Sequence, residues 1–164
     1  MSLPAFTLRG AEPRDLPAIV GLIRELAEFE HLSHLVQTTE EALHPHLFGP
    51  RPVAEAVVAE VDGAVVAFAL FFVNFSTFLA RPGLYLEDLY VQPAFRRLGL
   101  GQALLRHLGA LAVERGYGRF EWSVLDWNAN AIAFYERMGA SVLPDWRICR
   151  VTGDALAAFG RAGD

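Results

Sequence analysis

The spacing of apolar residues along the chain alternates between the periods of helices and strands, which predicts a mixed fold. Residues 6–9 have the alternation of a first strand. Pro13 and Pro17 are tolerable near a helix start. Helical spacing follows in the apolar positions Ile19, Leu22, Ile23, Leu26 and Phe29. The residues from Thr38 to Glu41 have the form of a capping box, which predicts a second helix reaching Phe48.

The middle of the chain predicts paired strands. Residues 54–61 and 64–73 flank Asp62-Gly63, a strong hairpin turn. Residues 78–83 are expected to form a loop. The elements predicted after it are a strand over 84–91, a helix over 100–114, a strand over 119–125, a helix over 129–138, a strand over 146–151 and a short helix near Ala155. At 164 residues the chain is expected to form one domain, residues 1–164.

A glycine-containing turn joins the strand over 84–91 to the helix after it. Its sequence is Arg96-Arg-Leu-Gly-Leu-Gly101. Glycines let the backbone approach a ligand closely, and the free N–H groups of a helix start attract phosphate. The dinucleotide motif G-x-G-x-x-G fails because Leu104 occupies its third glycine position, and the nucleotide-triphosphate loop fails because Gln102-Ala103 follows. The turn therefore predicts another phosphate-bearing cofactor.

A second block of sequence follows the strand over 119–125. It runs from Asp126 to Ala140 and contains Phe134-Tyr135. Asn128 is a good N-cap for the short helix that follows, and Gly139 suits the helix end because glycine tolerates a positive φ. The block predicts a capped short helix that presents its side chains next to a strand end.

The two blocks together, in this order, resemble the coenzyme A loop and the fourth sequence block of the GNAT acetyltransferase superfamily. This resemblance implies an α/β (α+β) single-domain fold, with a mixed, mostly antiparallel twisted sheet of six to seven strands flanked by helices on both faces. It implies acetyl-CoA as co-substrate. The residues implied to bind it are Leu89, Tyr90, Val91, Arg96, Arg97, Leu98, Gly99, Leu100, Gly101, Gln102, Asn128, Ala131 and Tyr135.

Further segments resemble the branch of diamine (spermidine/spermine) and thialysine N-acetyltransferases. They include Tyr85-Leu-Glu-Asp88, Asp126-Trp-Asn128 and Asp145-Trp-Arg147, and the similarity extends from about Leu8 to Val151. The implied reaction is direct transfer of an acetyl group to the primary amine of a small substrate, either a diamine or polyamine or a thialysine-like amine. The branch also implies a homodimer.

Acetyl transfer to an amine requires a base and an acid. An alkyl amine with a pKa near ~10 is mostly protonated at neutral pH and must lose a proton before it attacks. The resemblance makes Glu87 the water-assisted base and Tyr135 the general acid that protonates the leaving thiolate. By simple strand alternation Asp88 faces away from Glu87, so we rank it below Glu87.

The same resemblance implies a set of residues that line the acceptor channel: Phe29, Glu30, Glu87, Glu121, Trp122, Ser123 and Asp145. Carboxylates there attract a cationic amine, and aromatic rings pack against its methylenes. The polyamine enzymes carry an acidic residue near the position of Thr77, and this chain does not. The missing charge favours a shorter or lysine-like amine over a long polycation.

Composition and residue spacing bear on the partners, location and metal content expected for the protein. The net charge of -5 argues against nucleic acid. The uncharged run 64–80 is shorter than the ~20 residues of a membrane span, so no membrane is expected. The single cysteine, Cys149, and the lack of a recognisable secretory signal fit the cytoplasm. The histidine pairs His31/His34 and His44/His46 lack metal-site neighbours, so no metal is expected.

Two alternatives to a small-amine acetyltransferase stay open. The acceptor could be a protein or peptide amine, or another small amine such as an aminoglycoside. The chain could also be a non-catalytic acyl-CoA sensor. Retention of both Glu87 and Tyr135 argues against the sensor.

Overall fold

A computed structural model describes residues 5–161 of the chain. They fall into two compact units, of which the first ends at Ser123 and the second begins at Val124. The expectation of a single domain over residues 1–164 stays a prediction.

The first unit is built on a five-stranded sheet with the order β1-β2-β3-β4-β5. The strands are β1 (Phe6–Gly10), β2 (Glu55–Val61), β3 (Ala64–Ser76), β4 (Arg81–Val91) and β5 (Phe120–Trp122). The first four pair antiparallel, and β5 pairs parallel to β4. The mixed, mostly antiparallel sheet is confirmed. The strand count of six to seven is wrong, because five strands form among the residues described.

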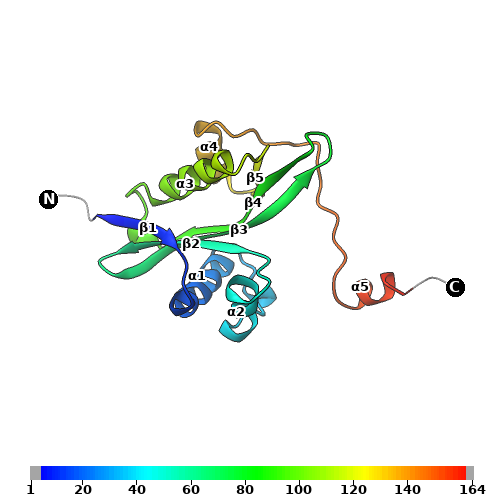
Figure 1. Cartoon of the computed structure of the whole chain (residues 1–164), viewed down its shortest axis with the longest axis horizontal. Helices are drawn as coiled ribbons and strands as arrows, with labels where there is room; N and C mark the ends of the chain where they lie inside the picture. The colour runs from blue at the N-terminus through cyan, green and yellow to red at the C-terminus, as the bar shows by residue number, and fades with distance from the viewer. Residues whose placement is uncertain (1–4, 162–164) are drawn as a thin grey trace. The chain divides into compact units, whose positions relative to one another are not determined.

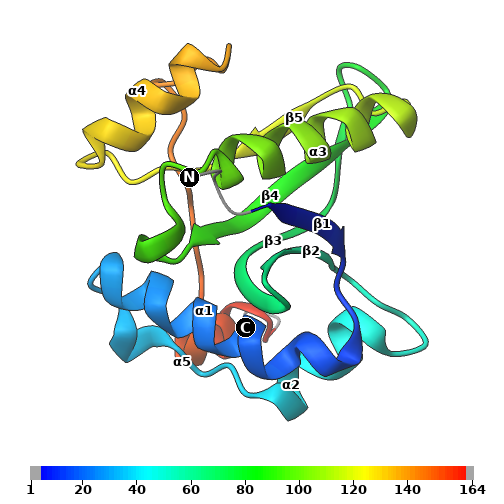
Figure 2. The same cartoon turned by 90° about the vertical axis from the view of Figure 1, so that its left-hand side faces the viewer.

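Helices cover both faces of this sheet. The helices α1 (Leu16–Phe29) and α2 (Glu40–Phe48) lie on one face and α3 (Leu100–Glu114) on the other, as both views show (Figures 1 and 2). Three short 3-10 turns join them, at Pro13–Asp15, Ser33–Leu35 and Pro93–Phe95. The buried core between α1, α2 and the sheet consists of Leu16, Ile19, Leu22, Leu47, Ala56, Val58, Phe68 and Tyr90.

The turn chemistry is confirmed at the first hairpin and shifted by one residue at α2. Asp62 and Gly63 have φ of 51° and 78°, the left-handed values that a tight two-residue hairpin turn requires. The N-cap of α2 is Thr39, whose hydroxyl accepts a hydrogen bond from the Ala42 amide at 3.1 Å. The predicted capping box at Thr38 is therefore wrong by one position, since either threonine can cap.

The second hairpin is longer than the sequence predicted. Strand β3 continues to Ser76 and β4 starts at Arg81, so the expected loop 78–83 is reduced to a turn over 77–80. Phe78 in this turn is 95% exposed. Some of the aromatic residues in the uncharged run 64–80 therefore lie in the end of this hairpin and not in the core. Within residues 5–161, no helix has the length and apolarity to cross a membrane.

A bulge interrupts the pairing of β3 with β4. Phe71 pairs with Leu86, and the next residue back on β3, Leu70, pairs with Asp88. One step along β3 thus corresponds to two along β4, which leaves Glu87 as the extra residue. Beyond this point every side chain of β4 lies on the opposite face from the one that strict alternation predicts.

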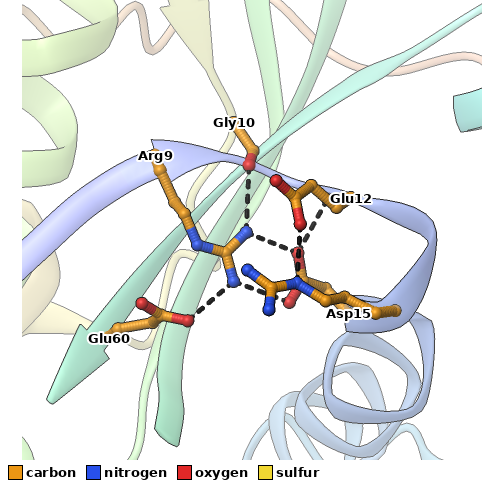
Figure 3. Close-up of polar contacts among 6 residues, drawn as sticks. Arg9, Gly10, Glu12, Asp15 and Glu60 are labelled. Carbon is orange, nitrogen blue, oxygen red and sulfur yellow. Dashed lines mark hydrogen bonds and ion pairs between the residues drawn. The ribbon is translucent and has the colours of Figure 1, made fainter. Parts of the chain in front are cut away.

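A charged cluster fastens β1 and β2 to the start of α1. The Arg9 guanidinium donates to both carboxylate oxygens of Asp15, at 2.7 and 2.9 Å, and to Glu60 Oε1 at 2.7 Å (Figure 3). Asp15 is only 4% exposed, and it also accepts a hydrogen bond from the Glu12 amide at 2.7 Å. The paired guanidinium lowers the pKa of Asp15. Nothing in the sequence pattern had singled out this cluster.

The second unit contains two helices, α4 (Ala129–Arg137) and α5 (Gly153–Phe159). The first agrees with the helix predicted over 129–138, and the second with the short helix expected near Ala155. The predicted strand over 146–151 is wrong, because these residues have no strand partner within the chain that the structure describes. Trp146 and Ile148 are 80% and 71% exposed. Residues 123–125 are likewise outside β5, which is shorter than the predicted strand 119–125.

Candidate active site

Strand β4 leaves part of its edge unpaired in the first unit. Its pairing with β5 ends where Leu86 meets Trp122, although β4 continues to Val91. β5 pairs with β4 only from Leu84 to Leu86, so the same edge of β4 is unpaired from Glu87 to Val91. Predicted cofactor-binding residues Leu89, Tyr90 and Val91 lie on this stretch. An extended amide chain can add to such an edge as another strand does.

The open edge leads into the loop before α3, whose backbone has the shape of an anion site. Arg97 and Gly99 have φ of 72° and 81°, and the Gly99 N-cap of α3 has no side-chain capping bond. The first N–H groups of α3, from Leu100 to Gln102, thus have no cap from a side chain. A Cβ added at Gly99 would meet no atom within 4 Å. The loop offers uncapped donors beside open space, and its role as the cofactor loop stays a prediction.

The other members of the predicted cofactor set differ in their surroundings. Arg97 is exposed, whereas the Leu98 side chain is half-buried and Leu100 is buried. A Cβ on Gly101 would lie 4.0 Å from Leu89, which is ordinary van der Waals contact. The Gln102 amide oxygen, in its better orientation, accepts a hydrogen bond from Arg106 at 2.9 Å.

Arg96 is held by the protein more firmly than its neighbours in the loop. Its Nε donates to the Val91 carbonyl at 3.0 Å. Its Cζ lies 5.6 Å from the centre of the Phe29 ring and 5.5 Å from that of the Tyr90 ring. These are cation–π distances. The sequence assigned Arg96 to the cofactor and Phe29 to the acceptor, and the structure brings the two side chains into contact.

Two adjacent carboxylates occupy the bulge at the start of the open edge. Glu87 is exposed and Asp88 is half-buried. Asp88 pairs with Leu70, which packs against the core under α1, so its side chain lies on the α1 face. Burial raises the pKa of Asp88 to about 6, and the charges of Glu87 and Glu30 contribute. The bulge interrupts the simple alternation by which Asp88 was ranked below Glu87, and the ranking itself stays a prediction.

The acceptor residues predicted in the first unit lie on α1 and β5. Phe29 ends α1 and is 43% exposed, and burial raises the pKa of Glu30 beside it. On β5, Glu121 is paired with Tyr85 and accepts a weak hydrogen bond from the Asn74 amide at 3.4 Å.

The remaining β5 positions are set by local contacts. Ser123 follows β5, and its hydroxyl lies 2.8 Å from that of Tyr85. The Trp122 ring packs against Phe120 with their centres 4.9 Å apart. Glu121 and Ser123 thus both neighbour Tyr85 of β4, Glu121 through backbone strand pairing and Ser123 through the hydroxyl contact.

The second unit aligns three predicted residues on α4. The Asn128 Oδ1 accepts a hydrogen bond from the Ala131 amide at 3.2 Å, which confirms the predicted N-cap. Asn128, Ala131 and Tyr135 follow at intervals of three and four and therefore share one face of the helix. Tyr135 is half-buried, with its ring 5.6 Å from that of Phe134. Gly139 ends the segment with φ of 100°. Asp145 is exposed beyond it.

Sequence reasoning missed the position of Asp88 and the contact of Arg96 with two rings. The bulge leaves no residue signature, since neighbouring acids in a strand read the same with or without it. The ring contact joins residues 29 and 96 and follows only from the fold. Among the residues described, no group of histidine, cysteine and carboxylate side chains could hold a metal ion.

The family model of the acetyltransferase (GNAT) family matches residues 20–140. The chain belongs to this family. The match spans both the loop before α3 and the α4 segment, so the two sequence blocks that carried the resemblance lie within it. As a GNAT family member the chain is an acetyl-CoA-dependent N-acetyltransferase.

Relatives of this GNAT chain include enzymes that match it along nearly its full length. The thialysine N-epsilon-acetyltransferase of Mus musculus is 38% identical, covering 91% of this chain and 94% of the relative. The L-ornithine N5-acetyltransferase NATA1 of Arabidopsis thaliana is 37% identical, covering 94% and 87%. The spermidine/spermine N(1)-acetyltransferase-like protein 1 of Homo sapiens is 30% identical over 94% of this chain but 24% of its own length.

Solved structures share the GNAT fold at lower identity. An integron cassette protein from the mobile metagenome of V. cholerae superposes with a TM-score of 0.80 at 22% identity, covering 96% of this chain and 98% of the other. An aminoglycoside acetyltransferase from an uncultured soil metagenomic sample gives 0.75 at 19% identity, covering 90% and 95%. At this identity the likeness concerns the fold alone.

Proposed function

We propose that the chain transfers the acetyl group of acetyl-CoA to the primary amine of a small substrate of the thialysine or ornithine kind. The observation that carries the proposal is the open edge of β4. It begins at a carboxylate, Glu87, and leads directly into the uncapped start of α3. A thioester laid along that edge has its diphosphate at the helix and its reacting end near the carboxylate.

The cofactor is held mainly by the backbone in this proposal. The diphosphate accepts hydrogen bonds from the amides of the loop over 96–101 and the first turn of α3. The pantetheine arm pairs with Leu89, Tyr90 and Val91 as an added strand. An amide in this stretch polarises the thioester carbonyl. Asn128 and Ala131, in the second unit, are proposed as further cofactor-binding residues from the family resemblance.

The chemistry needs three proton transfers. Glu87 takes a proton from the substrate ammonium through a water molecule, and the free amine then attacks the thioester carbonyl carbon. The C–N bond forms, the C–S bond breaks, and the departing thiolate takes the proton of the Tyr135 hydroxyl. The nitrogen gives up its second proton to solvent as the amide forms, and Tyr135 regains its proton from solvent. The phenol, with an ordinary pKa of ~10, can protonate a thiolate whose conjugate acid lies near ~8.5.

The acceptor side is acidic and suits a compact cation. Glu30, Glu121 and Asp145 supply charge, Phe29 and Trp122 supply apolar surface, and Ser123 a hydroxyl. Burial raises the pKa of Asp88 on the α1 face, and the negative charges of Glu87 and Glu30 add to the effect. Thr77, at the tip of the second hairpin, adds none. A short amine with one terminal cation fits this set better than a long polyamine.

Steady-state assays with a panel of acceptors test the proposal. Free thiol release from acetyl-CoA is followed with thialysine, ornithine, a diamine, spermidine, an aminoglycoside and a lysine peptide. We expect the highest kcat/KM for thialysine or ornithine. A higher kcat/KM for the peptide would show that the acceptor is a protein amine and would contradict the proposal. Binding of CoA with no turnover of any amine would favour the sensor.

We also propose that the enzyme acts in the cytoplasm as a homodimer, without nucleic acid or membrane partners. The dimer is supported by large apolar side chains that are exposed in each unit. They are Val73, Phe75, Phe78 and Leu79 in the first, and Trp146, Ile148 and Phe159 in the second. The acidic net charge of -5 supports the absence of nucleic acid.

A further inference from the structure

We propose that Arg96 is a positioning residue that couples cofactor binding to amine binding, by joining the diphosphate loop to the acceptor end of α1. This inference rests on the proposed function, since it concerns the same two half-sites. In it Arg96 acts through Phe29, in addition to the charge that it offers to the cofactor.

The contact geometry carries the inference. Arg96 opens the loop, and Phe29 is the last residue of α1. The guanidinium lies within 5.6 Å of the Phe29 ring centre and 5.5 Å of the Tyr90 ring centre, so it lies close to both aromatic side chains. Its Nε bond to the Val91 carbonyl, 3.0 Å long, fixes the direction of the group. A planar guanidinium held in this way cannot move with the loop unless its contacts with the two rings also change.

A second contact supports the same connection. Gln92, immediately after β4, donates from Nε2 to Glu25 Oε2 on α1 at 3.1 Å. The segment between β4 and α3 is therefore tied to the second half of α1 at two positions. A cofactor that fixes the position of Arg96 therefore also restricts Phe29. Glu30 follows Phe29 directly, so the residues proposed to bind the amine are restricted as well.

The energetic consequence is reciprocal. A ligand that orders the loop favours the Phe29 position that Arg96 contacts, and an amine that orders the end of α1 favours the loop in return. An exposed cation–π contact corresponds to about twofold to fivefold in affinity. We therefore expect CoA to bind about twofold to fivefold more tightly when thialysine is present.

A double-mutant cycle tests the coupling. Affinity for CoA is measured by calorimetry for the wild type, Arg96→Gln, Phe29→Leu and the double variant. Phe29→Leu is expected to weaken CoA binding about twofold to fivefold, although its side chain belongs to the acceptor helix. In the Arg96→Gln background the same change is expected to have no further effect. Phe29→Tyr, which keeps a ring, is expected to restore the affinity.

Matched controls separate this effect from general damage. Arg24→Gln removes the same charge from an exposed position of α1, and Phe78→Leu makes the same change at a side chain that is 95% exposed. Both are expected to bind CoA like the wild type. In Phe29→Leu the KM for thialysine should rise with kcat changed by less than about twofold, because a positioning contact affects binding before chemistry.

The outcomes separate a failure of the proposed function from a failure of the coupling through Arg96. If the wild type gives no heat with CoA, the proposed function fails. If CoA binds and Phe29→Leu leaves its affinity unchanged, or the two substitutions are additive, the coupling fails while the proposed function stands.

Discussion

Single residues decide which parts of the site the sequence could reveal. Asn128 and Gly99 carry their roles in their chemistry, because a short polar side chain caps a helix and a glycine accepts a φ of 81°. Asp88 does not, because its surroundings depend on a bulge between strands far apart in sequence. Residues whose role is local were predicted, and those whose role depends on register were not.

Replacing Tyr135 with Phe tests the general acid. The variant keeps the ring and loses the proton donor, so kcat is expected to fall about 10²-fold while CoA affinity changes by less than about twofold. Stopped-flow thiol release and calorimetry measure the two quantities. Tyr117→Phe makes the same change in the turn after α3 and should leave kcat unaltered. An unchanged kcat in Tyr135→Phe would remove the residue from its proposed role.

The raised pKa of Asp88 predicts a pH-dependent stability. Its pKa rises on folding from 3.8 to about 6, so the folded state holds this proton longer than the unfolded chain. Below pH 4 both states are protonated, and stability then decreases as the pH rises through 6. Asp88→Asn removes this loss and should stabilise the protein by about 1–2 kcal/mol at pH 8, with little effect at pH 4.

Denaturant unfolding of both proteins at several pH values measures this difference. Asp62→Asn, the same substitution at an exposed hairpin turn, provides the control. A stabilisation by Asp88→Asn that does not vary with pH would contradict the assignment of the shifted carboxyl.

At the scale of elements, the helices and strands that depend on local signals agree with the sequence prediction better than those that depend on a distant strand partner. Helices α1, α3 and α4 were predicted closely, because their periodicity and caps lie within one segment. The second hairpin exceeded its prediction because its strands also pair over residues 74–76 and 81–83, where Gly83 and Pro82 are poor strand signals in a sequence. The strand predicted over 146–151 mixes apolar residues with Arg147 and Arg150, and it has no strand partner in the described chain. The sequence of a short segment can allow pairing, but it identifies no partner.

The two ends of α3 allow a controlled test of the diphosphate loop. Gly99 before the helix and Gly116 after it have φ of 81° and 72°, and an added Cβ meets nothing within 4 Å at either. Alanine at each position should therefore cost a similar free energy of folding, about 1 kcal/mol. Only Gly99→Ala is expected to weaken CoA binding, by about tenfold or more. Equal CoA affinities for the two variants would argue against the loop as the cofactor site.

The cluster of Arg9, Asp15 and Glu60 is expected to govern acid stability where β1, β2 and α1 meet. The pKa of Asp15 is lowered on folding, so its contribution is present above the ordinary value near 3.8 and is lost as the pH falls through the folded value. Asp15→Asn should cost about 1–3 kcal/mol at pH 7, because it weakens a nearly buried pair.

The cost of Asp15→Asn should shrink as the pH falls below the ordinary pKa of 3.8 and the wild-type carboxyl becomes protonated. Thermal unfolding at pH 7 and at decreasing acid pH measures it, with Asp62→Asn again as the control. A cost that is the same at all these pH values would mean that the charge of Asp15 is not what stabilises the junction.

At the scale of the whole molecule, the most prominent surface feature is exposed apolar area. We propose that a second copy covers the segment around Trp146 and Ile148, whose side chains are 80% and 71% exposed. Light scattering during size-exclusion chromatography should give twice the mass of one chain. Ile148→Lys is expected to shift the protein toward the mass of a single chain, and Val113→Lys, at a side chain that is 80% exposed on α3, is not. Identical masses for both variants would place the contact elsewhere.

The unpaired backbone of β4 also affects how the enzyme behaves when it is purified. A row of free main-chain donors and acceptors is a template on which another chain can add, and this is a common start of aggregation. In our proposal pantetheine covers that row in every turnover. Adding coenzyme during expression and storage should therefore keep the sample dispersed, and samples stripped of coenzyme should be the first to precipitate.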